Sequence, residues 1–103
     1  MTFSIVIPTY NGMLFVEKAI QSALAQTRKA DEIIISDDNS TDDTLAICKK
    51  YKSQIKIYIN PNGPSGFVNG WNNAIQYCTS DYIAILHQDD IFAPNFLEEI
   101  EHA

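Results

Sequence analysis

Residues 33–38 read IIISDD and residues 82–90 read YIAILHQDD, so two short apolar runs are each followed closely by adjacent aspartates. Apolar runs of this length are typical of buried strands in a parallel sheet. Ligands of open parallel sheets bind at the edge where the carboxyl ends of the strands meet. Paired carboxylates at that edge favour a hard divalent cation, or the hydrogen-bond donors of a sugar or a base. The two stretches therefore predict a metal-assisted nucleotide or phosphate site.

The rest of the chain alternates strand-like and helix-like segments around these two stretches. Apolar, β-branched runs predict buried strands over residues 3–7, 32–36, 55–59 and 81–86. Helical spacing of apolar residues predicts helices over residues 14–26, 42–52, 67–78 and from Pro94 onward. Ser40 or Thr41 is a candidate N-cap of the second helix. This order predicts an α/β fold, with a doubly wound, mainly parallel four-stranded sheet flanked by helices.

Length and charge restrict the class of protein. We expect the 103 residues to form a single domain over residues 1–103. The net charge of −6 argues against a general nucleic-acid binder, which would present a basic face. Every Lys and Arg lies at or before Lys56, so an anionic ligand near Asp89 and Asp90 would lack basic partners from the C-terminal half. A metal ion would then be needed to bridge it.

Two features bear on the cellular compartment. Cys48 and Cys78 are far apart, show no metal-type spacing and are expected to be buried thiols, which fits a reducing, cytoplasmic compartment. The first residues do not resemble a signal peptide, and no apolar stretch approaches the roughly 20 residues that span a bilayer.

The acidic pair Asp89 and Asp90 has two interpretations. One carboxylate ligates a metal ion, or Asp90 caps the last helix. Capping alone does not explain two adjacent acids behind His87 and Gln88, so metal ligation is favoured. His87 itself is more easily explained as a hydrogen-bonded structural residue than as a ligand.

The acidic pair Asp37 and Asp38 is ambiguous by itself, because Asp is common in turns and caps that follow a strand. Opposite a second acidic strand end, a carboxylate there is placed to accept a hydrogen bond from an imide N–H or a ribose hydroxyl. Tyr10, after the first strand, is either an aromatic face for a base or a core aromatic. The pattern alone leaves both alternatives open.

Residues 60–66, NPNGPSG, are a dense cluster of turn residues. The cluster is not a P-loop, since it has no Lys, and it lacks the spacing of the dinucleotide-binding fingerprint. On the helix that follows, Trp71 is most simply a core residue, and Asn72 and Asn73 are compatible with solvent exposure.

With these residues placed, the chain resembles the N-terminal, nucleotide-sugar-binding half of glycosyltransferase family 2, which has the GT-A fold. The matching segments are residues 4–11 (SIVIPTYN), 21–27 (QSALAQT), 37–44 (DDNSTDDT), 72–75 (NNAI) and 89–90 (DD) with Pro94. They occur in the family's order, cover essentially the whole chain and are together highly specific.

The resemblance implies a role for each matched position. The residues that would bind the nucleotide and donor are Pro8, Thr9, Tyr10, Asp37, Asp38, Asn72 and Asp89. Asp38 would hydrogen-bond the nucleobase, and Asp89 would lie by the ribose and the sugar phosphate. Asp90, with Asp89, would bind the Mn²⁺ or Mg²⁺ ion that bridges the diphosphate.

Two positions depart from the family's pattern. His87 stands where an Asp commonly begins the acidic motif, so the metal affinity or preference is expected to differ. Trp71 stands where an Arg often precedes the Asn that corresponds to Asn72, so a basic contact to the donor is expected to be missing.

The activity implied by the resemblance is that of a metal-dependent, inverting glycosyltransferase in polysaccharide or glycoconjugate synthesis. Its donor is a nucleoside-diphosphate sugar, most commonly a UDP-sugar, and its acceptor is an unidentified saccharide, lipid or protein. No acid here matches the family's catalytic base by position. We therefore expect this chain to be the donor-binding half of a longer enzyme, with no catalytic residue of its own.

Alternatives to this interpretation stay open. The chain is alternatively a catalytically inert nucleotide-binding module that lacks the acceptor half. A nucleotidyltransferase-like domain would bring a basic, Gly-rich loop after the first strand, and residues 9–13 (TYNGM) contain no Arg or Lys. Faces that a missing half would cover favour a homo-oligomer. We expect a cytoplasmic location, at the inner face of the membrane where the remainder or a partner provides the anchor.

Overall fold

The computed structural model describes the backbone of all 103 residues and every side chain except those of Phe67 and Val68. Strands β1 (Phe3–Thr9) and β2 (Glu32–Asp37) are the centre of one sheet, and β3 (Lys56–Ile59) and β4 (Tyr82–Ile85) are its edges. The strand order is β3-β2-β1-β4, and all neighbouring strands are parallel.

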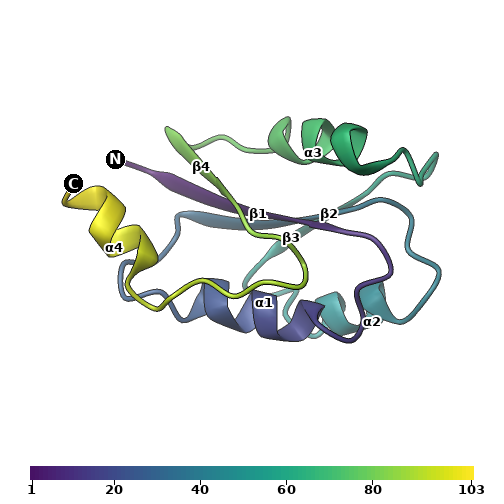
Figure 1. The fold of residues 1–103 in the computed structure, drawn as a ribbon, viewed down its shortest axis with the longest axis horizontal. Coiled ribbons are helices and arrows are strands. Elements are labelled where there is room, and N and C mark those ends of the chain that lie inside the picture. The colour runs from purple at the N-terminus through teal and green to yellow at the C-terminus, as the bar shows by residue number, and fades with distance from the viewer.

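Helices cover both faces of this sheet (Figure 1). One face carries α1 (Val16–Leu24), α2 (Thr44–Lys49) and α4 (Phe96–Glu101), and the opposite face carries α3 (Phe67–Ile75). Parallel strands need crossover connections, which these helices provide. The predicted α/β fold with a doubly wound parallel sheet is confirmed, although each helix is shorter than its apolar spacing predicts.

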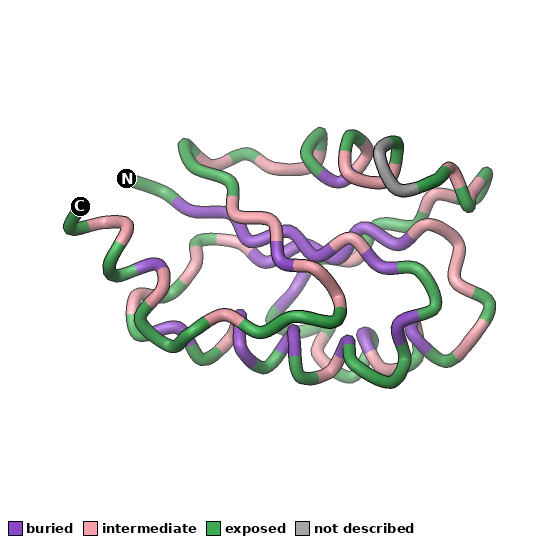
Figure 2. Tube along the Cα trace, in the orientation of Figure 1, coloured by how far each residue is buried: buried purple, intermediate pink, exposed green. Residues whose placement is uncertain are grey.

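Alternation along the two central strands supplies a core on each face of the sheet. The larger core lies between the sheet and helices α1, α2 and α4. Its buried members from β1, β2 and α1 are Phe3, Ile5, Ile7, Ile33, Ile35, Val16, Ala19, Ile20 and Ala23. The smaller core joins Val6 and Ile34 to Ala74 of α3. Successive side chains of a strand point to opposite faces, so one apolar run serves both cores. Figure 2 shows the buried residues concentrated along the central strands and on the helices beside them.

The last strand is less buried than the sequence predicts. The prediction of a buried strand before Asp89 is wrong for its first half, where Tyr82 is 49% and Ile83 is 41% exposed. The reason is that β4 pairs only with β1 and forms an edge of the sheet within the described chain. An exposed apolar edge strand is compatible with association between chains, and the homo-oligomer stays a prediction.

The predicted N-cap of the second helix is also wrong. Helix α2 begins at Thr44, and the Asp42 carboxylate accepts hydrogen bonds from the Thr44 N–H at 2.9 Å and from the Thr44 hydroxyl. Ser40 instead donates to the carboxylate of Asp37. Ser, Thr and Asp are all good capping residues, so the sequence did not distinguish between them.

A buried glutamine holds the segment that follows β4 against α1. Gln26 Nε2 donates to the Ala93 carbonyl at 2.7 Å, and Gln26 Oε1 accepts from the Leu97 N–H at 3.0 Å. The Phe92 N–H also donates to the Ser22 hydroxyl of α1 at 3.1 Å. These bonds position the acidic loop between β4 and α4. Within the described residues, every helix is too short or too polar to span a lipid bilayer.

Candidate functional site

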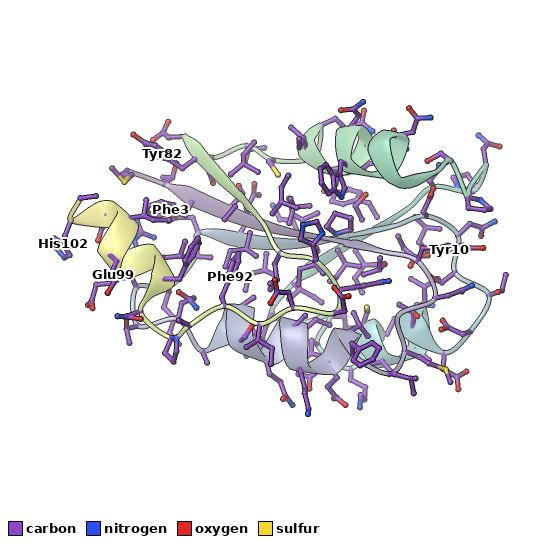
Figure 3. All side chains as sticks on the ribbon, in the orientation of Figure 1. Phe3, Tyr10, Tyr82, Phe92, Glu99 and His102 are labelled. Atoms are coloured by element: carbon purple, nitrogen blue, oxygen red, sulfur yellow. The ribbon has the colours of Figure 1, made fainter. Side chains whose placement is uncertain are left out.

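A cavity of about 420 Å³ opens at the carboxyl ends of β1, β2 and β4. Its lining residues are Pro8, Thr9, Tyr10, Ser36, Asp38, Pro64, Gly66, Gly70, Trp71, His87, Gln88 and Asp89. Figure 3 shows Tyr10 at this end of the molecule, with Phe3, Tyr82 and Glu99 at the opposite end. The cavity therefore lies at the sheet edge where the sequence predicts a ligand site.

Tyr10 and Gln88 join the end of β1 to the loop after β4. The Tyr10 N–H donates to Gln88 Oε1 at 2.8 Å, and Gln88 Nε2 donates to the Tyr10 carbonyl at 3.0 Å. Gly12 makes room for this pair, since a Cβ atom there would lie 2.3 Å from Gln88 Oε1. The Tyr10 side chain lines the cavity and is 40% exposed, so the alternative of a core aromatic is wrong.

Asp37 is a buried carboxylate that binds other residues of the protein. Asp37 Oδ1 accepts hydrogen bonds from the Thr9 hydroxyl at 2.5 Å and the Ser40 hydroxyl at 2.7 Å, and Oδ2 accepts one from the Ser40 N–H at 2.8 Å. These bonds tie the end of β1 to the loop after β2. Asp37 is not among the described residues that line the cavity. A direct contact between Asp37 and a nucleotide-sugar donor stays a prediction.

Asp38, the next residue, does line the cavity. Asp38 Oδ1 accepts hydrogen bonds from Asn60 Nδ2 at 3.1 Å and from the Ser65 hydroxyl at 3.0 Å, and Oδ2 accepts one from the Ser65 N–H at 2.7 Å. Gly63 packs against the same carboxylate, since a Cβ atom there would lie 2.5 Å from Oδ1. The turn cluster of residues 60–66 therefore orients an acid of the site.

Asp89 and Asp90 are both exposed, and Asp89 lines the cavity. The Asp90 N–H donates to the His87 carbonyl at 3.0 Å, and Asp90 Oδ1 accepts from the Ile91 N–H at 2.9 Å. The alternative that Asp90 caps the last helix is wrong, because α4 begins at Phe96 and Asp90 binds its own loop.

The carboxylate oxygens beside the cavity suit a cation that is also bound by the phosphates of a ligand. The described His, Cys, Asp and Glu side chains form no group of three or more that could hold a metal ion. Mg²⁺ in nucleotide sites is usually held by only one or two carboxylates, by water and by the substrate phosphates, and carboxylates also suit Mn²⁺. The adjacent, exposed carboxylates of Asp89 and Asp90 match that pattern.

Trp71 of α3 and His87 of the loop after β4 meet at the wall of the cavity. Their ring centroids lie 5.2 Å apart, with an angle of 52° between the ring planes. Both residues line the cavity, so Trp71 is not the plain core residue that its spacing favours. The two positions that depart from the family's pattern are therefore neighbours. Asn72 is exposed and outside the described lining, so its role at the donor stays a prediction.

Several site residues were missed by the sequence analysis. Asn60 and Ser65 lie in a cluster of turn residues, which predicts a loop but not the target of its side chains. Gln88 carried no signal, because a neutral polar residue after a strand is compatible with any loop.

Comparison with known proteins supports the resemblance seen in the sequence. The family model described as glycosyl transferase family 2 matches residues 4–102. The chain is 42% identical over 87 residues to the Escherichia coli UDP-Glc:alpha-D-GlcNAc-diphosphoundecaprenol beta-1,3-glucosyltransferase WfaP, covering 84% of this chain and 35% of WfaP. It spans 14% to 35% of the length of the curated relatives it matches.

Solved structures of transferases share the fold. The chain superimposes on S. aureus TarS in complex with UDP with a TM-score of 0.89 and 25% identity, covering 99% of this chain and 31% of TarS. It also matches Mycobacterium tuberculosis glucosyl-3-phosphoglycerate synthase in complex with Mn²⁺, UDP and phosphoglyceric acid. That match has a TM-score of 0.73 and 25% identity, and it covers 87% of this chain and 34% of the synthase.

Proposed function

This chain belongs to glycosyl transferase family 2, and we propose that it binds the nucleotide-sugar donor of a metal-dependent, inverting transferase. The donor is a nucleoside-diphosphate sugar, with a UDP-sugar as the first candidate, and the product is a polysaccharide or glycoconjugate. The observation that carries the proposal is the cavity that brings Tyr10, Asp38 and Asp89 together from the ends of three strands.

The cavity has the chemistry that a nucleotide requires. Tyr10, Pro8 and Pro64 offer aromatic and apolar surface for the face of a base. The Asp38 carboxylate accepts hydrogen bonds and so suits an N–H group of that base. The cavity volume of about 420 Å³ lies within the usual range for small-molecule sites.

Asp89 and Asp90 would hold a Mn²⁺ or Mg²⁺ ion together with the donor's diphosphate. When bound, such an ion neutralises the negative charge that develops on the leaving nucleoside diphosphate. Since the chain has no Lys or Arg after Lys56, a cation is the natural charge complement on this side of the cavity. The Mn²⁺ and UDP in the M. tuberculosis synthase support the assignment.

Sugar transfer with inversion also needs a general base within hydrogen-bond reach of the acceptor hydroxyl. The acids of this cavity are assigned to binding the nucleobase, the sugar donor and its cation, and none is left as the general base. The chain spans about a third of the solved transferases it resembles, and we place the catalytic base and the acceptor site in further sequence of a longer enzyme. The diphosphoundecaprenol-linked acceptor in the name of WfaP supports a lipid-linked saccharide as acceptor, which would bring the enzyme to the membrane surface.

Calorimetric titration of UDP into the purified chain, with Mn²⁺ and with EDTA, tests this proposal. We expect binding to weaken by about tenfold or more in EDTA, because the carboxylates then face the diphosphate without a cation. Asp90→Ala should remove the difference between the two conditions. Glu98→Ala is the matched control, since it removes an exposed acid from α4, which lies at the end of the molecule away from Tyr10 (Figures 1 and 3).

Two results would contradict the proposal. Equal affinity in Mn²⁺ and EDTA would disprove the role of the metal. Failure of UDP, GDP and dTDP to bind would disprove the donor site in this chain.

A catalytically inert nucleotide-binding module is the second candidate, since the acids of this cavity are assigned to the nucleobase, the donor and its cation and none to general-base catalysis. Both candidates predict the same nucleotide binding. The two candidates differ in enzymatic turnover. Only the transferase candidate predicts sugar transfer when this donor-binding half is joined to an acceptor half.

A further inference from the structure

We propose that Asn60 and Ser65 set the base preference of this site by occupying all but one of the acceptor positions of the Asp38 carboxylate. The inference rests on the proposed function, because it takes Asp38 as the residue that faces the nucleobase. It follows from the unequal use of the two oxygen atoms of one carboxylate.

Asp38 Oδ1 has no acceptor position left. A carboxylate oxygen offers about two lone-pair positions. Asn60 Nδ2 and the Ser65 hydroxyl fill them, at 3.1 and 3.0 Å. Gly63 packs closely against the same atom, because a Cβ atom on Gly63 would lie only 2.5 Å from Oδ1.

Asp38 Oδ2 is used differently. Among the described donors it accepts one hydrogen bond, from the Ser65 N–H at 2.7 Å. It lies 3.9 Å from the position that a Cβ atom on Gly70 would occupy, and Gly70 lines the cavity. The second lone pair of Oδ2 is therefore the acceptor position that a ligand in the cavity can reach.

The loop that supplies these donors is itself anchored. The Asn60 N–H donates to the Asp37 carbonyl at 2.8 Å, and Asn39 Nδ2 donates to the Gly63 carbonyl at 3.2 Å. The Asn62 N–H donates to Asn60 Oδ1 at 3.1 Å, which turns the Asn60 amide so that its Nδ2 faces Asp38. Loss of one side-chain donor would therefore change the occupancy of Asp38 without releasing the loop.

One open acceptor position distinguishes bases by the number of adjacent N–H donors on their pairing edge. Uracil and thymine present a single imide N–H between two carbonyls. Guanine presents N1–H and N2–H side by side, and a carboxylate pairs with both only when each oxygen accepts one of them. With Oδ1 occupied, Asp38 satisfies the uracil edge but leaves one guanine N–H without a partner, which is costly once water is excluded. The site should therefore prefer UDP or dTDP to GDP.

Calorimetric titration of UDP and GDP, each with Mn²⁺, into wild type and two variants tests this inference. The readout is the ratio of the GDP Kd to the UDP Kd. Ser65→Ala and Asn60→Ala each free an acceptor position on Oδ1, so the ratio should fall by about threefold to tenfold, the size of one net hydrogen bond. Ser65→Thr keeps the hydroxyl and should keep the wild-type ratio.

Asn62→Ala is the matched control, since Asn62 is exposed in the same loop and contributes its backbone N–H to Asn60. If the loop had a merely structural role, Ser65→Ala and Asn60→Ala would raise the Kd values of UDP and GDP by the same factor. An unchanged ratio in Ser65→Ala and Asn60→Ala, or a wild type that prefers GDP, would overturn the inference and leave the donor site standing. A wild type that binds neither nucleotide would overturn both the inference and the proposed function.

Discussion

The two pairs of adjacent aspartates are alike in sequence and opposite in structure. The carboxylates of Asp37 and Asp38, at the end of β2, together accept six hydrogen bonds from donors within the protein. Asp89 and Asp90, after β4, are exposed, and among the described residues their carboxylates accept one hydrogen bond, from the Ile91 N–H to Asp90. Paired carboxylates at a strand end are therefore not a metal site by themselves. The second pair keeps most of its acceptor capacity free for a cation, whereas most acceptor positions of the first pair are occupied.

The positions of the two strands in the sheet explain this difference. β2 lies between β1 and β3, so Thr9 of β1 and Asn60 after β3 both reach its terminal aspartates. Within the part of the chain that the structure describes, β4 lies at an edge with only β1 beside it. Fewer neighbouring segments surround its end, and its aspartates stay open to ligands.

Of the substitutions predicted below, removal of the Asp37 carboxylate should lower the stability of the protein most. The Thr9 hydroxyl and two donors of Ser40 would lose their acceptor at a site where Asp37 is only 1% exposed. Buried donors without a partner cost about 1–3 kcal/mol, so Asp37→Ala should lower the free energy of unfolding by about 3 kcal/mol in a urea titration. Asp43→Asn, which removes an exposed negative charge and keeps a residue suited to the N-cap position of α2, should change it by less than about 0.5 kcal/mol. Equal losses in the two variants would contradict the structural role of Asp37.

Glu32, at the opposite end of β2, is a third carboxylate that accepts several hydrogen bonds from groups within the protein. It accepts hydrogen bonds from the Ser4 hydroxyl at 2.6 Å, the Thr79 N–H at 2.7 Å and Lys56 Nζ at 3.1 Å. Burial raises the pKa of Glu32, but these bonds outweigh it and lower the pKa from its usual 4.5 to about 2.

The lowered pKa of Glu32 predicts how stability depends on pH. Since the pKa is lower in the folded state, the stabilisation is fully present above pH 4.5 and is lost as the pH falls toward 2. Glu32→Gln should cost about 1–2 kcal/mol at neutral pH. It should also flatten the decline of the unfolding free energy over the acidic range, measured by urea titration at successive pH values. A variant with the wild-type pH slope would rule out this role for Glu32.

Asp89→Asn should have the smallest effect on stability. The Asp89 side chain is exposed and next to a second negative charge, so we expect the free energy of unfolding to change by less than about 0.5 kcal/mol. The same variant should weaken UDP binding in Mn²⁺, measured by calorimetry, by about tenfold. A stability loss comparable with that of Asp37→Ala would remove the distinction between the two acidic pairs.

The sequence by itself determined the strands, the parallel sheet and the acidic edge. The apolar runs before the two acidic pairs encode strands, of which β2 is buried and β4 is partly exposed. The spacing of Val16, Ala19, Ile20 and Ala23 encodes the inner face of α1. These are local patterns with periods of two or about four residues, so they can be seen without knowledge of the fold. The matching motifs were also local, which is why the family was predicted correctly.

Only the tertiary structure decided what each polar side chain does at that edge. It buried Asp37, placed Asp38 in the cavity wall, brought Asn60 and Ser65 onto Asp38, and joined Gln88 to Tyr10. These last contacts join residues 22 to 78 positions apart in the chain. A polar side chain is compatible with many partners, and the partner it finds depends on the strand order and on the path of the loops, which no local pattern encodes.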